Sequence, residues 1–241
     1  MLRHKGKNRT FLHNLKLASI LSFVAGLVNI AGLLYSGILT TNVTGHFAYF
    51  AEELVNGNYI RTVHFIGYIL AFLSGAFLSG ILMQVPFMKA QGNNYILPLL
   101  TEIFLICFAG FSSYTLSSEL TAGMLLLAMG LQNALVTFIS NSVVRTTHLT
   151  GLFTDLGIEL SQLCFRRKQT DRNKLSRNIG LRISIIAFFF AGGVLGGFGF
   201  KVFGIKILIV ALICLISALA YDTILFRLYR IKRKIKEKAW Y

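Results

Sequence analysis

The stretch TTHLTGLFTDLGIEL at residues 146–160 occurs a second time in the chain, as TTNVTGHFAYFAEEL at residues 40–54. The two copies align without a gap and share seven of fifteen residues: Thr40/Thr146, Thr41/Thr147, Thr44/Thr150, Gly45/Gly151, Phe47/Phe153, Glu53/Glu159 and Leu54/Leu160. Because hydroxyls, a glycine and a carboxylate recur in one register, the matches indicate an internal repeat. The fold therefore depends on how the two halves around these motifs are arranged.

The composition is that of a membrane protein. The 241 residues are 55% hydrophobic and only 14% charged, with a mean hydropathy of +0.66, which is outside the balance of soluble domains. The net charge of +15 comes from 24 Lys and Arg against nine Asp and Glu. These charges lie mostly in tails and loops beside apolar runs, and no nucleic-acid-binding signature is present. We therefore expect no nucleic-acid partner.

Six stretches contain the roughly 20 apolar residues that a membrane-crossing helix needs. They cover about 15–39, 62–85, 95–114, 121–139, 179–200 and 205–226. The first stretch has full spanning length and no cleavage signature directly after it, so we expect a retained helix and not a signal peptide. The chain is predicted to form a single integral membrane domain.

The distribution of basic residues predicts the orientation of the chain. With the N-terminus in the cytoplasm, the basic tails 1–14 and 227–241 and the central loop at 166–177 all lie inside, whereas only Arg61, Lys201 and Lys206 lie outside. Positive charge is retained on the cytoplasmic side. We therefore expect six spans with both termini cytoplasmic, and tails that bind anionic lipid headgroups.

The repeat is predicted to be inverted. Each half, about 15–114 and 121–226, contains a span, a motif and two further spans, and three is an odd number. The second half consequently begins on the opposite side of the membrane. Further matches support the alignment: GLVN at 26–29 with GLQN at 130–133, and SGAFLSG at 74–80 with AGGVLGG at 191–197. Small residues allow close helix contact, so we expect the second and fifth spans to make the tightest packing.

The motifs are expected to interrupt the helices. Thr, Val, Asn and Gly are poor continuations of a helix, and Thr44 and Thr150 are candidate caps for the amphipathic segments that follow. A helix start beside hydroxyls attracts anions. In secondary transporters, breaks from two inverted repeats meet near the bilayer midplane and bind the solute. Alternatively, each motif is a capped turn at the membrane surface.

The candidate solute-binding residues are the polar members of both motifs, the amides of the preceding spans and one carboxylate: Asn29, Thr41, Asn42, Thr44, Gly45, Gln132, Asn133, Thr147, His148, Thr150, Gly151 and Asp155. The amides either line the site or form interhelical hydrogen bonds. Asp155 is a candidate to bind a cation or carry a proton, and Glu53 and Glu159 are candidates to pair with nearby basic residues. Glu102 is either an intramembrane functional carboxylate or an interfacial side chain.

No metal, cofactor or enzymatic activity is predicted. His46 and His148 are isolated histidines without a third ligand, and the three cysteines, Cys107, Cys164 and Cys214, form neither a disulfide framework nor a metal cluster. A nucleophile elbow, a metalloprotease motif and a phosphate-binding glycine loop are all missing from the sequence.

The segments FVAGLVNIAG (23–32), TTNVTG (40–45), MGLQNALV (129–136) and RTTHLTGLFTDLG (145–157) carry a family resemblance. The chain resembles the YoaK family of bacterial membrane proteins, also called domain of unknown function 1275, over nearly its whole length. The resemblance implies a bacterial inner-membrane protein with about six spans and no assigned biochemical role. Members have an acidic residue at the position of Asn29 and Asn at that of His46, and these departures argue against a proton-coupled role for the first half.

Together these features predict an all-α membrane protein of six transmembrane helices, arranged as two inverted three-helix repeats. The favoured function is a small permease for a small polar or anionic solute, and apolar helix faces predict a homodimer. The alternative is a non-transporting scaffold or regulatory subunit whose central basic loop contacts lipid or a cytoplasmic protein. An intramembrane enzyme is the third hypothesis.

Overall fold

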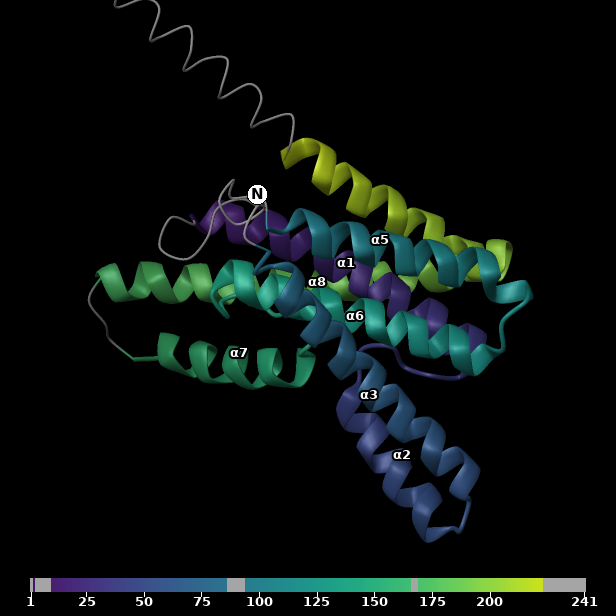
Figure 1. Cartoon of the computed structure of the whole chain (residues 1–241). Helices are drawn as coiled ribbons and strands as arrows, with labels where there is room; N and C mark the ends of the chain where they lie inside the picture. Colours follow the sequence, from purple (N-terminus) through teal and green to yellow (C-terminus); the bar gives the residue numbers. More distant parts are fainter. Residues whose placement is uncertain (1, 3–9, 86–93, 166–168, 223–241) are drawn as a thin grey trace, which may run out of the picture.

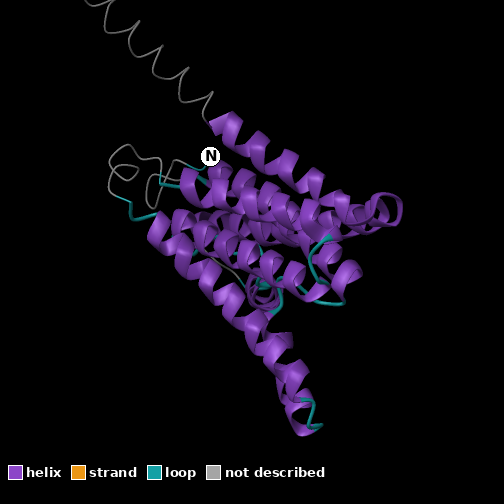
Figure 2. Cartoon of the chain, turned by 45° about the vertical axis from the view of Figure 1, so that its right-hand side comes forward, coloured by secondary structure: helices purple, strands orange, loops and turns teal. Residues whose placement is uncertain are grey.

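The computed structural model describes residue 2 and residues 10–85, 94–165 and 169–222. Most of the two basic tails, residues 86–93 between the second and third predicted spans, and part of the central basic loop lie outside the described residues. The described chain is helical, and it contains no β-strand (Figure 2). Its helices form an elongated bundle from which one hairpin projects (Figure 1).

The helices follow the predicted order. They are α1 (Phe11–Ser36), α2 (Val43–Val55), α3 (Tyr59–Leu82), α5 (Ile96–Phe111) with the 3-10 turn η2 (Ser112–Tyr114), α6 (Ser118–Ser140), α7 (Leu149–Leu163), α8 (Gln169–Phe203), the 3-10 turn η3 (Gly204–Ile207) and a further helix at 208–222. Five helical stretches are long and apolar enough to cross a membrane, the last being Asp171–Asp222. The protein is thus an all-helical membrane protein.

One expectation about the central loop is wrong. The central basic loop was expected at residues 166–177, but α8 already begins at Gln169. The polar sequence hides an amphipathic pattern: Leu175 and Ile179, one helical turn apart, are both buried. Asp171 in the first turn also favours a helix start at this point.

The long stretch at 171–222 reverses direction. Its 52 residues would extend about 78 Å as one straight helix, more than twice the hydrocarbon thickness of about 30 Å. The chain turns at Gly204, whose φ of +57° lies in the left-handed region where glycine carries no Cβ penalty. After the turn, residues 208–222 run back along the bundle (Figure 1).

Glycine crossings hold the bundle together. A Cβ added at Gly26 of α1 would overlap the carbonyl oxygen of Phe189 in α8, and one added at Gly192 would overlap the carbonyl oxygen of Phe23. The glycines aligned with these two are Gly130 and Gly75, and they pack in the same way. A Cβ added at Gly130 of α6 would overlap the carbonyl oxygen of Phe72 in α3, and one added at Gly75 of α3 would overlap the carbonyl oxygen of Leu127 in α6. The close packing predicted for the second and fifth spans is therefore made with α6 and α1, respectively.

The hairpin of α2 and α3 projects from the bundle (Figure 1). Only 17% of the most apolar stretch of α3 is buried, compared with 61% in α1 and in α6. The helix exposes a row of large apolar side chains, among them Ile60, Val63, Leu73 and Phe77, which suits contact with lipid. In contrast, α7 lies along the first half of α8.

Candidate functional site

The first motif folds back against the helix that precedes it. α1 ends at Gly37, which has a φ of +75°, and residues 37–42 are not helical. Thr40 is fully buried, and its methyl group is close to Gly32. The backbone N–H of Thr41 donates to Oδ1 of Asn29 at 3.1 Å. Because these contacts lie one to two turns inside α1, the break enters the bundle.

The second motif also enters the bundle. Residues 141–148 interrupt the helices, and Thr146 is fully buried. The Nε2 amide group of Gln132 donates to the Thr146 hydroxyl at 3.4 Å and to the carbonyl oxygen of Leu21 in α1 at 3.0 Å. Leu21 and Asn29, the α1 residues linked to the two breaks, are separated by about 12 Å along the helix axis.

The predicted caps are wrong by two residues. Asn42, not Thr44, caps α2, and its Oδ1 accepts the N–H of Gly45 at 3.0 Å. Asn is a stronger N-cap than Thr, and its side chain folds over Gly45, where an added Cβ would lie 2.7 Å from Nδ2 of Asn42. The cap position of α7 is occupied by His148 and not by Thr150, and His148 forms no side-chain cap bond. The motif glycines therefore make room for the cap residue.

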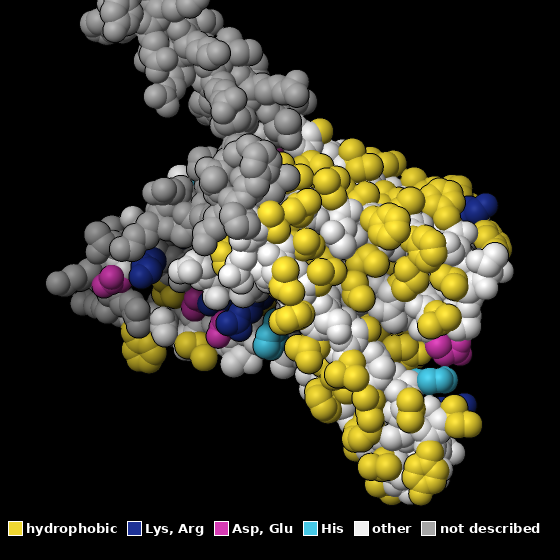
Figure 3. Space-filling view, in the orientation of Figure 1, with side chains coloured by type: hydrophobic (Ala, Val, Ile, Leu, Met, Phe, Trp, Pro, Cys, Tyr) yellow, Lys and Arg dark blue, Asp and Glu magenta, His cyan; other side chains and the backbone are white. Residues whose placement is uncertain are grey.

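A polar cavity of about 540 Å³ opens where α7 begins. Its walls come from the second break at residues 141–148, from α7 and from the start of α8. The lining residues are Ser142, Val143, Arg145, His148, Gly151, Leu152, Asp155, Lys174, Asn178, Leu181 and Arg182. Three predicted site residues, His148, Gly151 and Asp155, are brought together in this cavity. Figure 3 shows charged side chains gathered over α7 and the start of α8 on a face that is otherwise mostly hydrophobic.

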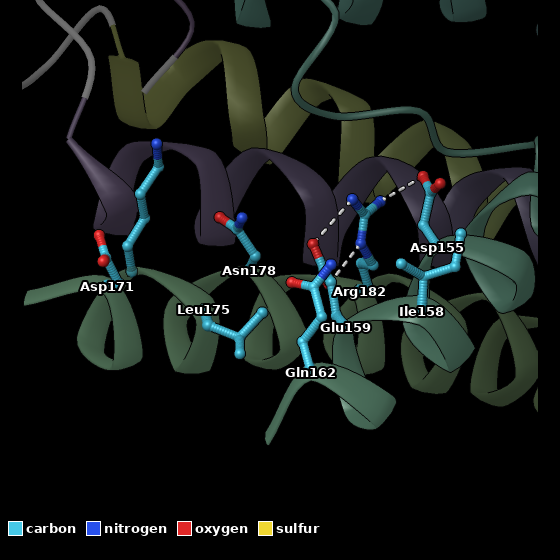
Figure 4. A pocket seen from close by; sticks show the side chains of 9 residues that line it. Asp155, Ile158, Glu159, Gln162, Asp171, Leu175, Asn178 and Arg182 are labelled. Carbon is cyan, nitrogen blue, oxygen red and sulfur yellow. Dashed lines mark hydrogen bonds and ion pairs between the residues drawn. The ribbon is translucent and has the colours of Figure 1, made fainter. Parts of the chain in front are cut away.

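Arg182 organises one wall of the cavity. Its guanidinium bonds Asp155 at 2.9 Å and both carboxylate oxygens of Glu159, at 2.8 and 3.1 Å (Figure 4). This bidentate geometry is the strongest ion pairing available to arginine. It confirms the expected pairing of Glu159 with a basic residue, as the 3.4 Å contact between Glu53 and Arg61 does in the first half. Asp155 already has a counter-charge, which disfavours its use as a cation ligand.

The remaining cations of the cavity favour an anion. Arg145 and Lys174 line it and form no ion pair with any residue that the structure describes. α7 has no side-chain cap, so the N–H groups of its first turn are open and its positive dipole end lies beside these cations. Cations beside the start of a helix are an arrangement that commonly binds anions such as carboxylate, phosphate or sulfate.

Other predicted site residues lie apart from this cavity. Asn29 lines an apolar groove of about 760 Å³ between α1 and α8, together with Leu149 from the second motif. Asn133 lines a groove of about 750 Å³ between α3 and α6, and its Oδ1 is buried without a hydrogen-bond partner in the described chain. Gln132 is an interhelical brace, and Thr44 and Thr150 are exposed. No described cavity is lined by polar residues of both motifs.

The backbone is strained at the edge of the polar cavity. Asn141 and Ser142 have φ values of +55° and +64°, a left-handed conformation that costs roughly 1–2 kcal/mol for a residue with a Cβ. At the end of α1 the left-handed position is occupied by Gly37. Ser142 lines both the polar cavity and the groove that contains Asn133, so the strained turn separates two open spaces.

His46 has a structural position in the first half. It is buried beside Phe65 and Tyr68, and its Nε2 lies 2.7 Å from the carbonyl oxygen of Leu39. Burial lowers the pKa of His46, and the bond to Leu39 opposes this change more weakly. The described residues contain no group of three His, Cys, Asp or Glu side chains that would hold a metal ion.

Among the lining residues that sequence reasoning missed, those with charged or amide side chains are Arg145, Lys174, Asn178 and Arg182. Arg145 directly precedes the second motif, and Arg182 is a lone cation within the predicted fifth span. A cation inside an apolar stretch requires an anionic partner, and Asp155 and Glu159 were available in the neighbouring amphipathic segment. Lys174 and Asn178 were hidden because their stretch was interpreted as a loop.

The helical bundle, with five helices long and apolar enough to span a membrane, defines an integral membrane protein. Residues 17–221 match the family described as protein of unknown function (DUF1275). Since the match covers most of the chain, the protein belongs to this family. No curated protein and no solved structure matches the chain.

Proposed function

We propose that the protein is a small permease for a small anionic solute, which binds in the polar cavity at the start of α7. One observation carries this proposal. In a cavity of about 540 Å³, the start of α7, which has no side-chain cap, lies beside two cations, Arg145 and Lys174. Neither cation has an ion-pair partner in the described chain. This volume suits a small molecule. Arg182, held by Asp155 and Glu159, supplies a rigid wall.

The topology that we propose has six crossings, both chain termini in the cytoplasm and two inverted repeats. Leu2 donates its N–H to Asp222 at 3.1 Å, and Lys16 bonds the Tyr221 hydroxyl at 3.0 Å. The start of α1 and the end of 208–222 therefore lie at the same end of the bundle, as an even number of crossings requires. Reversal at Gly204 supplies the sixth crossing, and the matched glycine crossings support the repeat.

The two interrupted helices support a transport cycle. α2 has 13 residues and α7 has 15, which gives lengths of about 20 and 22 Å, too short to cross the hydrocarbon core. From the middle of the molecule, α7 extends along the bundle, whereas α2 projects away from it beside α3 (Figure 1). Helix starts that face each other across an inverted repeat are the usual solute site of secondary transporters. The solute is then exposed to each side in turn.

Anion binding to the purified protein tests the site. We expect phosphate, sulfate or succinate to raise the melting temperature of the detergent-solubilised protein, because a ligand that binds only the folded state stabilises it. The double variant Arg145→Ala/Lys174→Ala is expected to lose this increase. Lys206→Ala is the matched control, since Lys206 lies beside Tyr114 at another part of the bundle. An equal increase in the double variant contradicts the proposed site.

Cysteine accessibility tests transport against a scaffold role. Single cysteines at Thr44 and Thr150, in a chain without its native cysteines, are labelled with a membrane-impermeant thiol reagent from each side. A transporter predicts that both positions become accessible from one common side, or that they change sides when the anion is added. If Thr44 is labelled only from outside and Thr150 only from inside under every condition, the scaffold hypothesis replaces the permease.

A further inference from the structure

Glu102 is a carboxyl group inside the bundle that has no partner among the described residues. It lies in the buried stripe of α5 between Leu99 and Ile106, and it has no solvent exposure. Neither carboxyl oxygen forms a hydrogen bond within the described chain. Its burial within a predicted membrane span favours the intramembrane interpretation of Glu102.

No cation in the described part of the chain neutralises Glu102. The titratable side chains on the elements packed against α5 are Arg61, His64 and Tyr68 in α3, Glu119 in α6, Tyr114 in η2, Lys206 in η3, and Cys214, Tyr221 and Asp222 in 208–222. Within the described residues, none forms a hydrogen bond or ion pair with Glu102. Because a buried, unpaired carboxylate is costly in a membrane, these surroundings favour the neutral form of Glu102.

Buried polar atoms without partners in the described chain also lie near the start of α5. Asn94, just before α5, donates to the carbonyl oxygen of Met83 at the end of α3, at 3.3 Å. Its Oδ1 and the hydroxyl of Ser79, one turn before Met83, are buried without partners in the described chain. Glu102 is about 12 Å further along the chain direction of α5. Such unpaired acceptors are positions at which water molecules bind.

A groove of about 750 Å³ between α3 and α6 lies close to Asn94. Its lining includes Asn133 and Met83, whose carbonyl oxygen accepts from Asn94. Ser142 lines this groove and also the polar cavity at the start of α7, so its turn lies between the two spaces.

We propose that Glu102 is a proton-binding site, which exchanges its proton with water when the conformation changes. The proton comes from hydronium or a buffer acid and adds to a carboxylate oxygen, with no other bond changed. Its use in driving anion uptake rests on the proposed permease function. The sequence argued against proton coupling in the first half because Asn29 replaces an acidic residue in α1. In this proposal, the proton-binding residue of the first half is Glu102 in α5.

A hydrophobic carbodiimide tests the proton site directly. Dicyclohexylcarbodiimide adds to protonated carboxyl groups in apolar surroundings and leaves a stable acylurea that peptide mass spectrometry locates. In the protein reconstituted into phosphatidylcholine vesicles, we expect an adduct on Glu102 that decreases as the pH rises. Glu102→Gln is expected to abolish it, and Glu119→Gln, which changes an exposed carboxylate, to preserve it. No adduct on Glu102 at acidic pH overturns the proposal.

Infrared spectroscopy provides the second measurement, and it needs no reagent access. The carbonyl stretch of a protonated carboxyl group should be present in the wild type and lost in Glu102→Gln, a nearly isosteric change that gel filtration checks for folding. Anion-induced changes in the melting temperature of Glu102→Gln report separately on the cavity at Arg145 and Lys174. Loss of the infrared band with retained anion binding supports the proton site, and an unchanged band refutes it whatever the anion result.

Discussion

The two helical hairpins α2–α3 and α7–α8 begin with the same motif but are held together by different chemistry. In the first, Tyr49 stacks on Phe65 with ring centroids 5.3 Å apart. Tyr49 aligns with Asp155 in the motif alignment, and Phe65 aligns with Arg182 when the separate alignment of the glycine segments is extended back along the helix. Asp155 and Arg182 form an ion pair of 2.9 Å. His46, buried in the aromatic cluster, aligns with Leu152.

This difference distinguishes the architecture that both halves share from the side chains that differ between them. The glycine crossings and the re-entrant threonines are present in both halves, so they belong to the shared architecture. The side chains between the paired helices are free to differ because the backbone arrangement does not depend on them. An aromatic contact suits a hairpin that faces lipid, whereas charged side chains suit one that borders a polar cavity. Function is therefore expected where the repeat has diverged.

The largest effect is expected at the glycine crossings. Gly192→Ala and Gly75→Ala each place a methyl group against a backbone carbonyl, which cannot move like a side chain, and we expect a loss of about 3 kcal/mol, at the upper end for overpacking. Gly192→Ala should destabilise the whole bundle, because α1 and α8 form its centre. Gly75→Ala should release mainly α2–α3. Thermal unfolding combined with hydrogen exchange separates the two results.

Gly180 and Gly67 are the matched controls for these two changes. They lie in the same helices, and an added Cβ meets nothing within 4 Å. Alanine at either position is expected to raise stability by about 0.5–1 kcal/mol, since glycine weakens a helix interior. Equal losses in all four variants would show that the crossings are not special.

A smaller effect is expected from breaking the ionic hairpin. Arg182→Ala leaves Glu159, whose side chain is only 11% exposed, without its partner, at a cost of about 2 kcal/mol. Hydrogen exchange over residues 149–163 should increase, while residues 43–68 remain unchanged. The triple variant Asp155→Tyr/Glu159→Gln/Arg182→Phe places the aromatic pair of the first hairpin in the second. It should restore the protection of residues 149–163 against hydrogen exchange. Failure of this variant would mean that the two chemistries are not interchangeable.

The paired amides are expected to differ by about 1 kcal/mol. Asn29→Ala removes the acceptor of the Thr41 N–H, so unfolding should become easier by roughly the value of one hydrogen bond. Asn133→Ala removes an oxygen that has no partner in the described chain, and the melting temperature should stay level or rise. A larger loss in Asn133→Ala would show that the amide binds a group such as water.

The smallest and most conditional effect concerns His46. Burial lowers the pKa of His46 below 6.5, so the folded state favours the neutral ring. The resulting stabilisation is complete above pH 6.5 and decreases as the pH falls towards the lowered pKa. Hydrogen exchange over residues 43–68 should therefore increase in acid. His46→Leu, which copies Leu152, should abolish this pH dependence; if the dependence persists, another group causes it.

Much of the fold could be predicted from the sequence, because the length of the apolar stretches and the repeated motif are local signals. The spans and the two interruptions follow from such signals. The cap positions did not, because the side chain of Asn42 folds over Gly45 to cap α2, whereas His148 occupies the cap position of α7 without a side-chain bond. Arg182 was missed because its partners come from another helix. The burial of Glu102 depends on which face of α5 meets its neighbours, and polarity alone does not determine that.

The glycine crossing between α1 and α8 also has a consequence for biosynthesis. Gly26 leaves the ribosome long before Gly192 is made, and at ordinary translation rates the delay is about ten to thirty seconds. During this time α1 lies in the bilayer without the helix that covers its glycine face. α3 waits similarly, although more briefly, for α6. The glycine faces of α1 and α3 each pack on a helix of the second half. A chain stopped after the first half would therefore expose both glycine faces to the quality-control machinery of the cell.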